Sequence, residues 1–262
     1  MGLAARVQRL VGNAVARRHP APIFVLGNQK SGTSAIALLL GQLTGLATAN
    51  DLRREIGEQL IDGVRAGTLP LSTLIRRNRL DFSRPIIKHP NLTLVYHELR
   101  SAYPAARYVF LVRDPLDNIR SIFDRLGLPG TTVTLEEADL AALPLAWRSI
   151  VKGASLGLAE SGGPCAVLAQ RWNLMVDVYL NAHREMVAVR YEDFVADKMG
   201  CIRGLASSLG LDQRFDISAS IDRQYQPRGV NRGIDPESFF GEANSALIRE
   251  ICRQRMPHFK YT

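Results

Sequence analysis

A lysine, a glycine and three hydroxyl side chains stand together in the run Lys30-Ser31-Gly32-Thr33-Ser34. Residues 23–26, just before this run, are apolar and predict a short buried strand, and the good helix formers at 35–40 predict a helix after it. A strand, a short loop and a helix expose free backbone N–H groups at the positive end of the helix. The run therefore predicts a site for a phosphate-like anion.

The side chains of this run fit the same chemistry. Thr33 or Ser34 is predicted to cap the helix, and the ammonium group of Lys30 can reach an anion held by the loop. The spacing of Gly27 and Gly32 matches the P-loop pattern G-x-x-x-x-G-K-[ST], but Thr33 stands where that pattern has its lysine. A small-molecule kinase that uses ATP and magnesium is therefore an alternative that lacks its most specific residue.

A second possible anion site follows the clearest apolar run, residues 108–112, which predicts a buried strand. Arg113 comes directly after it, Asp114-Pro115 is a typical helix start, and Ser121 falls on the second turn of that helix. A guanidinium group and a hydroxyl group can bind one phosphate between them. The kinase alternative would instead assign Asp114 to magnesium.

Together the two segments resemble the sulfotransferases that use 3′-phosphoadenosine 5′-phosphosulfate (PAPS). In that family, a loop like Lys30-Ser31-Gly32-Thr33-Ser34 holds the 5′-phosphosulfate, and a strand followed by Arg-x-Pro and a helical serine, here Arg113 and Ser121, holds the 3′-phosphate. The resemblance implies sulfuryl transfer to a hydroxyl or amine, with Lys30 stabilising charge on the leaving oxygen. It also implies the product 3′,5′-adenosine bisphosphate and no metal ion.

Two softer matches extend the resemblance. Arg190-Tyr191-Glu192-Asp193-Phe194 is similar to the Arg-Tyr-Glu-Asp-Leu segment of many sulfotransferases, in some of which the tyrosine position, here Tyr191, touches adenine. The family closes over the 3′-phosphate with a basic, glycine-containing loop near the C-terminus. Arg228-Gly229 is the better match to that loop, and Arg232 is the second.

Three residues are candidates for the base that takes the proton of the acceptor. His89 follows a predicted short strand, residues 86–88, and an imidazole suits a general base because it titrates near neutral pH. This stretch resembles the Lys-Thr-His segment of cytosolic sulfotransferases with one residue missing, and a structural histidine is the equal alternative. Asp51 and Glu55 are the other candidates, although a helix cap and a solvated helix face are the more ordinary roles for them.

The composition agrees with an enzyme of one domain. The 262 residues are 46% hydrophobic and 22% charged, with a net charge of +8 that suits a polyanionic ligand. A nucleic-acid-binding protein ranks last, because aromatic residues are only 7% and the arginines are scattered. We expect a small-molecule, carbohydrate or lipid-linked acceptor and no nucleic acid.

The expected fold is a single P-loop-like α/β domain over residues 21–262, with a central parallel sheet flanked by helices on both faces. Helices are predicted at about 34–45, within 52–80, after a cap at Asn91, at 165–183 and at 198–209. A fourth strand is predicted at 186–189. Residues 127–140 are predicted to form a mobile loop that contains a capping box, Thr134 to Glu137. Residues 1–20 form an amphipathic helix that we expect to pack on the domain; peripheral contact of residues 1–19 with a membrane is the alternative.

The three cysteines are far apart and no run of 18 apolar residues exists. These features predict reduced thiols in a cytoplasmic protein without a transmembrane span. Because the Golgi sulfotransferases of animals have a membrane anchor, the resemblance then implies a soluble, bacterial member of the family. The sequence leaves the oligomeric state open.

Overall fold

The computed structural model describes residues 11–159, 161–226, 229–231 and 233–262. Most of the predicted N-terminal helix lies outside these ranges; of its residues, 11–15 are helical. Arg228 and Arg232 also lie outside the described residues, so the predicted basic loop over the 3′-phosphate is represented there by Gly229.

Five parallel strands form one sheet within the described residues, in the order β2-β3-β1-β4-β5. Their bounds are β1 Ile23–Gly27, β2 Thr48–Asn50, β3 Ile86–Lys88, β4 Arg107–Val112 and β5 Met186–Arg190. The sequence predicted four of them. It missed β2, which is only three residues long and has no apolar run.

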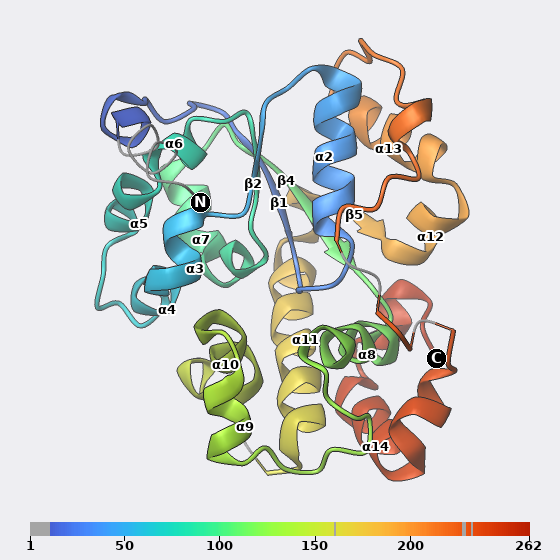
Figure 1. The fold of residues 1–262 in the computed structure, drawn as a ribbon. Coiled ribbons are helices and arrows are strands. Elements are labelled where there is room, and N and C mark those ends of the chain that lie inside the picture. The colour runs from blue at the N-terminus through green and yellow to red at the C-terminus, as the bar shows by residue number, and fades with distance from the viewer. Residues whose placement is uncertain (1–10, 160, 227–228, 232) are drawn as a thin grey trace.

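Helices cover both faces of this sheet (Figure 1). Their bounds are α2 Thr33–Thr44, α3 Arg53–Glu58, α4 Leu60–Arg65, α5 Leu71–Arg77, α6 Arg79–Phe82, α7 Tyr96–Ala102, α8 Pro115–Leu126, α9 Glu137–Ala142, α10 Leu145–Lys152, α11 Gly163–Ala182, α12 Tyr191–Ala196, α13 Lys198–Ser208 and α14 Pro236–Cys252. The short 3₁₀ segments are η1 Pro90–Val95, η2 Ala154–Leu156, η3 His183–Glu185, η4 Ser218–Ser220 and η5 Met256–Phe259. The predicted fold, an α/β domain with a parallel sheet between helical layers, is confirmed.

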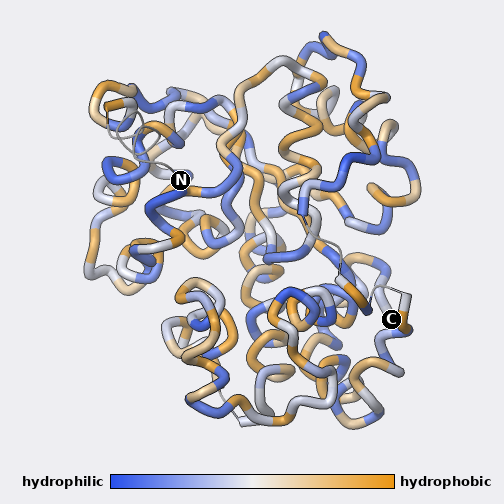
Figure 2. The backbone as a smooth tube through the Cα atoms, in the orientation of Figure 1, coloured by the Kyte–Doolittle hydropathy of each residue, from blue (hydrophilic) through white to orange (hydrophobic). Residues whose placement is uncertain are grey.

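Alternation along the strands explains the two layers. Ile23 and Val25 of β1 pack in a core cluster with α2 and α13, whereas Phe24 and Leu26 pack in a second cluster with α7, α8 and α11. Successive side chains of a strand point to opposite faces, so a strand that is apolar throughout requires cover on both sides. Figure 2 shows this as hydrophobic colouring along the central strands and the helices beside them.

The long helix α11 crosses one face, and its Trp172 is fully buried. The indole N–H of Trp172 donates to the carbonyl oxygen of Arg113 at 2.9 Å. The predicted inner face of this helix is confirmed for Trp172, Met175 and Val176, while Tyr179 is only partly buried. The helix therefore ties the core to the carboxyl end of β4.

Three predicted caps are wrong. Gly32 in the left-handed region precedes α2, and neither Thr33 nor Ser34 caps it. The capping box of α9 is formed by Glu136 and Asp139, because the helix begins at Glu137 rather than just after Thr134. The helix predicted after Asn91 begins as a 3₁₀ turn, η1, with His89 at its N-cap.

Other local predictions hold. Asp114 caps α8 by accepting from the N–H groups of Leu116 and Asp117, with Pro115 at the first helical position. All three cysteines are free. Across the described residues, no helix combines the length and the apolar character needed to span a bilayer.

Gly27, the last residue of β1, gives a direct test of this packing. Its φ is +128°, and a Cβ atom there would lie 2.3 Å from the carbonyl oxygen of Leu111 on the neighbouring strand β4. We expect Gly27→Ala to lower the free energy of unfolding by roughly 2–5 kcal/mol, since both backbone strain and a backbone clash are added. Urea denaturation measures this loss.

Gly67 is the matched control, because its φ is also positive, at +71°, but a Cβ atom there would meet no atom of the described residues within 4 Å. Gly67→Ala is expected to cost only about 1 kcal/mol, from the backbone alone. Equal losses in the two variants would contradict the close approach of β1 and β4.

Candidate active site

The loop between β1 and α2 presents free backbone N–H groups. Lys30, with a φ of 65°, and Gly32, with a φ of 85°, both lie in the left-handed region. Among the described residues, the N–H groups of residues 30–34 meet no hydrogen-bond acceptor. Alternating left- and right-handed residues at a helix N-terminus form a concave set of donors, which binds anions.

Two side chains tie the carbonyl groups of this loop back. Asn118 Nδ2 donates to the carbonyl oxygen of Gln29 at 2.8 Å, and Arg113 Nη1 donates to that of Lys30 at 3.2 Å. In a trans peptide the C=O and the next N–H point in opposite directions. Because these carbonyls are fixed, the N–H groups of Lys30 and Ser31 point away from the side chains that hold the carbonyls. On that opposite side the N–H groups are free to bind an anion.

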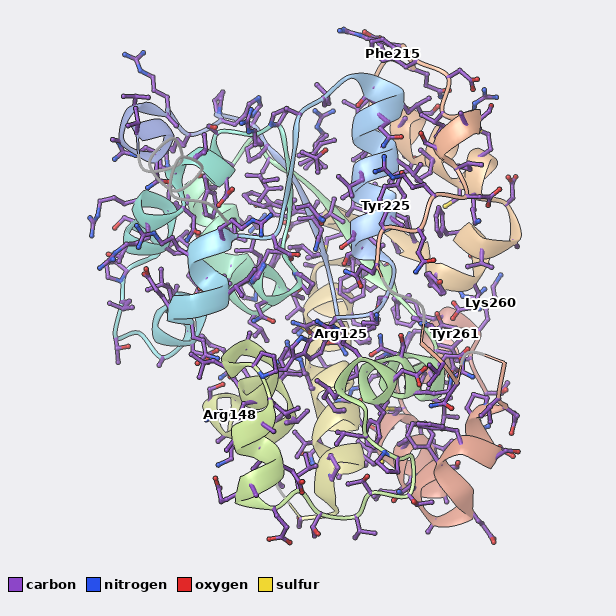
Figure 3. The ribbon with its side chains drawn as sticks, viewed as in Figure 1. Arg125, Arg148, Phe215, Tyr225, Lys260 and Tyr261 are labelled. Carbon is purple, nitrogen blue, oxygen red and sulfur yellow. The ribbon has the colours of Figure 1, made fainter. Side chains whose placement is uncertain are left out.

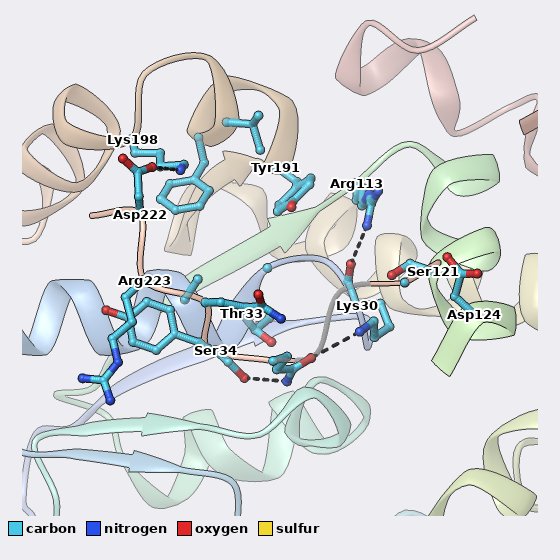
Figure 4. Close-up of a pocket in the computed structure, with 18 of the residues that line it drawn as sticks. Lys30, Thr33, Ser34, Arg113, Ser121, Asp124, Tyr191, Lys198, Asp222 and Arg223 are labelled. Carbon is cyan, nitrogen blue, oxygen red and sulfur yellow. Dashed lines mark hydrogen bonds and ion pairs between the residues drawn. The ribbon is translucent and has the colours of Figure 1, made fainter. Parts of the chain in front are cut away.

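A cavity of about 210 Å³ opens beside this loop (Figure 4). The residues predicted to hold the donor that line it are Lys30, Gly32, Thr33, Ser34, Arg113, Ser121, Tyr191 and Gly229. Ser31 is the exception, because its side chain is buried and its hydroxyl accepts from Asn118 Nδ2 at 3.0 Å. The fold thus brings the two predicted anion-binding segments, far apart in the sequence, to one cavity.

The cavity has a strongly positive wall. Burial, together with the charges of Arg113 and Arg125, lowers the pKa of Lys30. Burial likewise lowers the pKa of Arg113, whose guanidinium carbon lies 4.6 Å from the ring centre of Tyr191. Neighbouring positive charges such as those of Lys30 and Arg113 repel each other, so an anion bound near both is favoured.

Arg120 adds to this wall, whereas Lys198 lies at the opposite side of the cavity (Figure 4), and the sequence reasoning missed both. Arg120 lines the cavity beside Ser121 on α8, and its guanidinium donates to the carbonyl oxygens of Asn231 and Ile234 and to Asp117. Lys198 is paired with Asp222. The position of Arg120 directly before Ser121 was a usable signal, whereas nothing local marks Lys198.

The other end of the cavity has the apolar and aromatic side chains of Phe194, Val195, Ile221 and Tyr225 in its lining, beside the charged side chains of Lys198, Asp222 and Arg223 (Figure 4). Tyr225 lies against α2 (Figure 3). The apolar and aromatic side chains come from α12 and from the segment after η4, so only the tertiary structure joins them. A flat apolar ring system fits between such side chains.

Tyr191 explains why position 32 is a glycine. A Cβ atom there would lie 2.5 Å from Tyr191 Cδ2, so the ring of Tyr191 packs directly on the loop. In this position Tyr191 also contacts the guanidinium of Arg113. The ring therefore holds the two anion-binding segments together.

Gln226 bridges the loop from the segment that follows Tyr225. Its side chain accepts from Lys30 Nζ at 3.4 Å and donates to Ser34 Oγ at 3.1 Å. Sequence reasoning missed this residue, since an isolated glutamine in a polar tail has no distinguishing pattern.

Two of the three predicted bases form one unit with a lysine. Asp51 Oδ1 accepts from Lys88 Nζ at 2.7 Å and lies 3.3 Å from His89 Nδ1. Burial alone would raise the pKa of Asp51, but the hydrogen bond from His89 and the charge of Lys88 outweigh it and hold that pKa well below its usual range.

An ionised Asp51 assigns the hydrogen of His89 to Nδ1, which leaves Nε2 as an acceptor. His89 Nε2 is buried and has no hydrogen-bond partner within the described part of the chain. Lys88 pairs in register with Val25 of the neighbouring parallel strand β1. His89, the residue after Lys88, therefore lies at the same edge of the sheet as the loop that follows β1. Its free nitrogen suits proton abstraction.

Glu55, the third predicted base, has a structural position. Its carboxylate accepts from the N–H of Ile61 at 3.1 Å, at the start of α4, and the side chain is only 3% exposed. Burial raises its pKa to about 8. Its contacts match the helix-cap alternative rather than a base at the loop.

No group of three or more His, Cys, Asp or Glu side chains able to hold a metal ion occurs in the described ranges. The side chain of Asp114, the magnesium ligand of the kinase alternative, is engaged in capping α8.

Comparisons with known proteins agree with this arrangement. A sequence model described as the sulfotransferase family matches residues 51–216, a range that contains His89, Arg113, Ser121 and Tyr191 but not the loop at 27–32. None of the curated proteins compared matches the chain.

Three solved structures share the fold. The sulfotransferase STF9 of Mycobacterium avium has a TM-score of 0.57 at 13% identity, with 99% of this chain and 81% of that one covered. The sulfotransferase domain from the curacin biosynthetic pathway has a TM-score of 0.52 at 18% identity, covering 94% and 99%. A sulfotransferase from Alicyclobacillus acidocaldarius has a TM-score of 0.50 at 15% identity, covering 92% and 99%.

The position of Glu55 leads to a pH-dependent stability. Because its pKa in the folded protein, about 8, lies above the value of 4.5 for an exposed glutamate, its contribution to stability is complete below about pH 4.5 and is lost as pH rises through about 8. We expect Glu55→Gln to reduce the fall in unfolding free energy between pH 5 and pH 8.5.

Urea denaturation at the two pH values measures this difference, and Glu58→Gln, on the exposed face of the same helix, controls for the loss of one carboxylate. A fall in the Glu55→Gln variant as large as that in the wild type would show that Glu55 is not the titrating group.

Proposed function

Because this chain belongs to the sulfotransferase family, we propose that it transfers the sulfuryl group of PAPS to a hydroxyl or amine of a small-molecule, carbohydrate or lipid-linked acceptor. The single observation that supports this donor best is the shared cavity, which joins the loop at Lys30 to Arg113 and Ser121 and has apolar and aromatic side chains in its lining. Such a cavity suits a nucleotide that carries two anionic groups and a planar base.

In this proposal the loop binds the 5′-phosphosulfate through the N–H groups of residues 30–34 and the hydroxyls of Thr33 and Ser34. Arg113 and Ser121 bind the 3′-phosphate, which distinguishes the donor from ATP. Arg120 and Gly229 line the same cavity, and the family resemblance assigns Arg228 to the 3′-phosphate as well. Tyr191, Phe194 and Tyr225 lie where adenine would need a flat apolar contact.

The transfer forms a bond between sulfur and the acceptor oxygen or nitrogen as the bond between sulfur and the bridging phosphate oxygen breaks. His89 Nε2 takes the proton of the acceptor, and the carboxylate of Asp51 stabilises the imidazolium that results. Lys30 stabilises the negative charge that grows on the leaving oxygen. The 3′,5′-adenosine bisphosphate then leaves.

The kinase alternative gains no support from these contacts. Thr33 stands where a P-loop kinase has its lysine, and the carboxylate of Asp114 is occupied by two backbone N–H groups at the start of α8. Cytoplasmic location belongs to the proposal, and the unbridged thiols of Cys165 and Cys252 agree with a reducing compartment.

Calorimetric titration tests the donor. We expect 3′,5′-adenosine bisphosphate to bind without magnesium, and Arg113→Ala to weaken it by about 10- to 100-fold, since a hydrogen bond to a charged group is worth about 1.5–3 kcal/mol. Arg249→Ala, which breaks a surface ion pair with Glu237 on α14, is the control and should bind as the wild type does.

The same titration decides between the two enzyme classes. Magnesium-dependent binding of ATP together with no response to the bisphosphate would contradict the sulfotransferase proposal.

Removing the base should affect turnover and not donor binding. We expect His89→Gln to lower kcat by about 10²- to 10⁴-fold, while affinity for the bisphosphate stays within about twofold of wild type, because His89 does not line the donor cavity. The rate is measured as transfer of radiolabelled sulfate from PAPS to an acceptor found by screening phenols, sugars and glycolipids.

His97→Gln, at an exposed position of α7, is the matched control and should keep the full rate. If His89→Gln also kept the full rate, the structural-histidine alternative would replace the catalytic one.

A further inference from the structure

Arg171 of α11 is a buried cation with an unusual set of partners. It is 2% exposed, and its guanidinium donates to Asn28 Oδ1 at 3.3 Å, Gln29 Oε1 at 3.0 Å and Asn91 Oδ1 at 2.8 Å. All three acceptors are neutral amides. Asn28 and Gln29 belong to the anion-binding loop, and Asn91 lies in η1, just after His89.

No carboxylate lies within ion-pair distance of Arg171 in the part of the chain that the structure describes; the charge of Asp62 raises its pKa and that of Arg65 lowers it from beyond that distance. Burial lowers the pKa of Arg171 to about 10, so the side chain is still charged at neutral pH. A buried charge without an ion-pair partner is costly, because it loses its hydration and no adjacent opposite charge replaces it. A residue used only for packing would avoid this cost, which suggests that the charge has a function.

The contacts of Arg171 set the orientation of the loop. A guanidinium group only donates, so the amide oxygens of Asn28 and Gln29 must face it. This turns Asn28 Nδ2 toward Asn118 Oδ1, to which it donates at 3.0 Å. Asn118, oriented in this way, donates through its own Nδ2 to the carbonyl oxygen of Gln29 and to Ser31 Oγ.

The chain of bonds therefore ends at the carbonyl whose direction decides where the N–H of Lys30 points. An anion held by these N–H groups would also bring negative charge near a buried cation that has no carboxylate within ion-pair distance among the described residues. Both effects act on the loop, and Arg171 makes no hydrogen bond with Arg113 or Ser121, the residues predicted to bind the 3′-phosphate.

We propose that Arg171 is a positioning residue for the 5′ end of the donor: it orients the loop through Asn28 and Asn118 and supplies buried positive charge beneath it. The inference rests on the proposed function, because it assigns the loop to the 5′-phosphate group of the donor. It predicts that loss of Arg171 weakens only those ligands that have a 5′-anion.

A pair of ligands isolates this effect. Adenosine 3′-monophosphate lacks the 5′-phosphate of 3′,5′-adenosine bisphosphate, so the ratio of the two affinities reports on the loop alone. In calorimetric titrations we expect Arg171→Gln to weaken the bisphosphate by about tenfold or more and the monophosphate by no more than about twofold. Arg171→Lys keeps the charge but not the fork of donors, and should give a smaller, still selective loss.

Arg255→Gln is the control for general damage around α11, because it breaks the paired contact of Arg255 with Asp177 on that helix at 2.9 Å without touching the loop. It should leave both affinities unchanged. If Arg171→Gln does not fold, the comparison is made with Arg171→Lys alone.

Equal weakening of the two ligands, or no weakening of either, would overturn the role of Arg171 while leaving the proposed donor intact. If the wild-type protein bound the bisphosphate no more tightly than the monophosphate, that result would instead contradict the proposed function, and the role of Arg171 with it.

Discussion

The direction of two peptide groups in the loop after β1 is the constraint on which the candidate site depends. The carbonyl oxygens of Gln29 and Lys30 are held by Asn118 and Arg113, so the N–H groups that follow them are turned toward the cavity. Both holding side chains come from the β4–α8 segment. The segment predicted to bind one anion therefore also orients the loop predicted to bind the other.

The parallel sheet accounts for the rest of the arrangement. Because all five strands run in one direction, their carboxyl ends meet at one edge, where α/β folds place their ligands. The residue immediately after each strand belongs to the site or its support: Asp51 after β2, His89 after β3, Asn28 after β1, Arg113 after β4 and Tyr191 after β5. The positive cavity and the Lys88–Asp51–His89 unit lie at this edge as separate groups of charged side chains.

The buried polar side chains of Arg171 and Asn118 orient the loop after β1, although burying them costs stability. Arg171 and Asn118 are both buried, and both direct their donors to the loop. Apolar side chains of similar volume would avoid the desolvation of the charge, but they would leave the loop amides without fixed orientation. The close contact of Tyr191 with Gly32 is the apolar counterpart, since it excludes any side chain from position 32.

By itself the sequence determined the parallel α/β fold and four of the five strands, and it named the two segments predicted to bind anions, because apolar runs, glycines and a capping Asp-Pro are local signals. The sequence also named His89 and Asp51, as alternative candidates for the general base. Only the tertiary structure showed that the two side chains form a hydrogen bond with each other. The structure alone moved Glu55 to the start of α4 and brought Arg171 of α11 beneath the loop. These roles depend on partners about 6 to more than 140 residues away along the chain, and no local pattern encodes contacts that form only when the core packs.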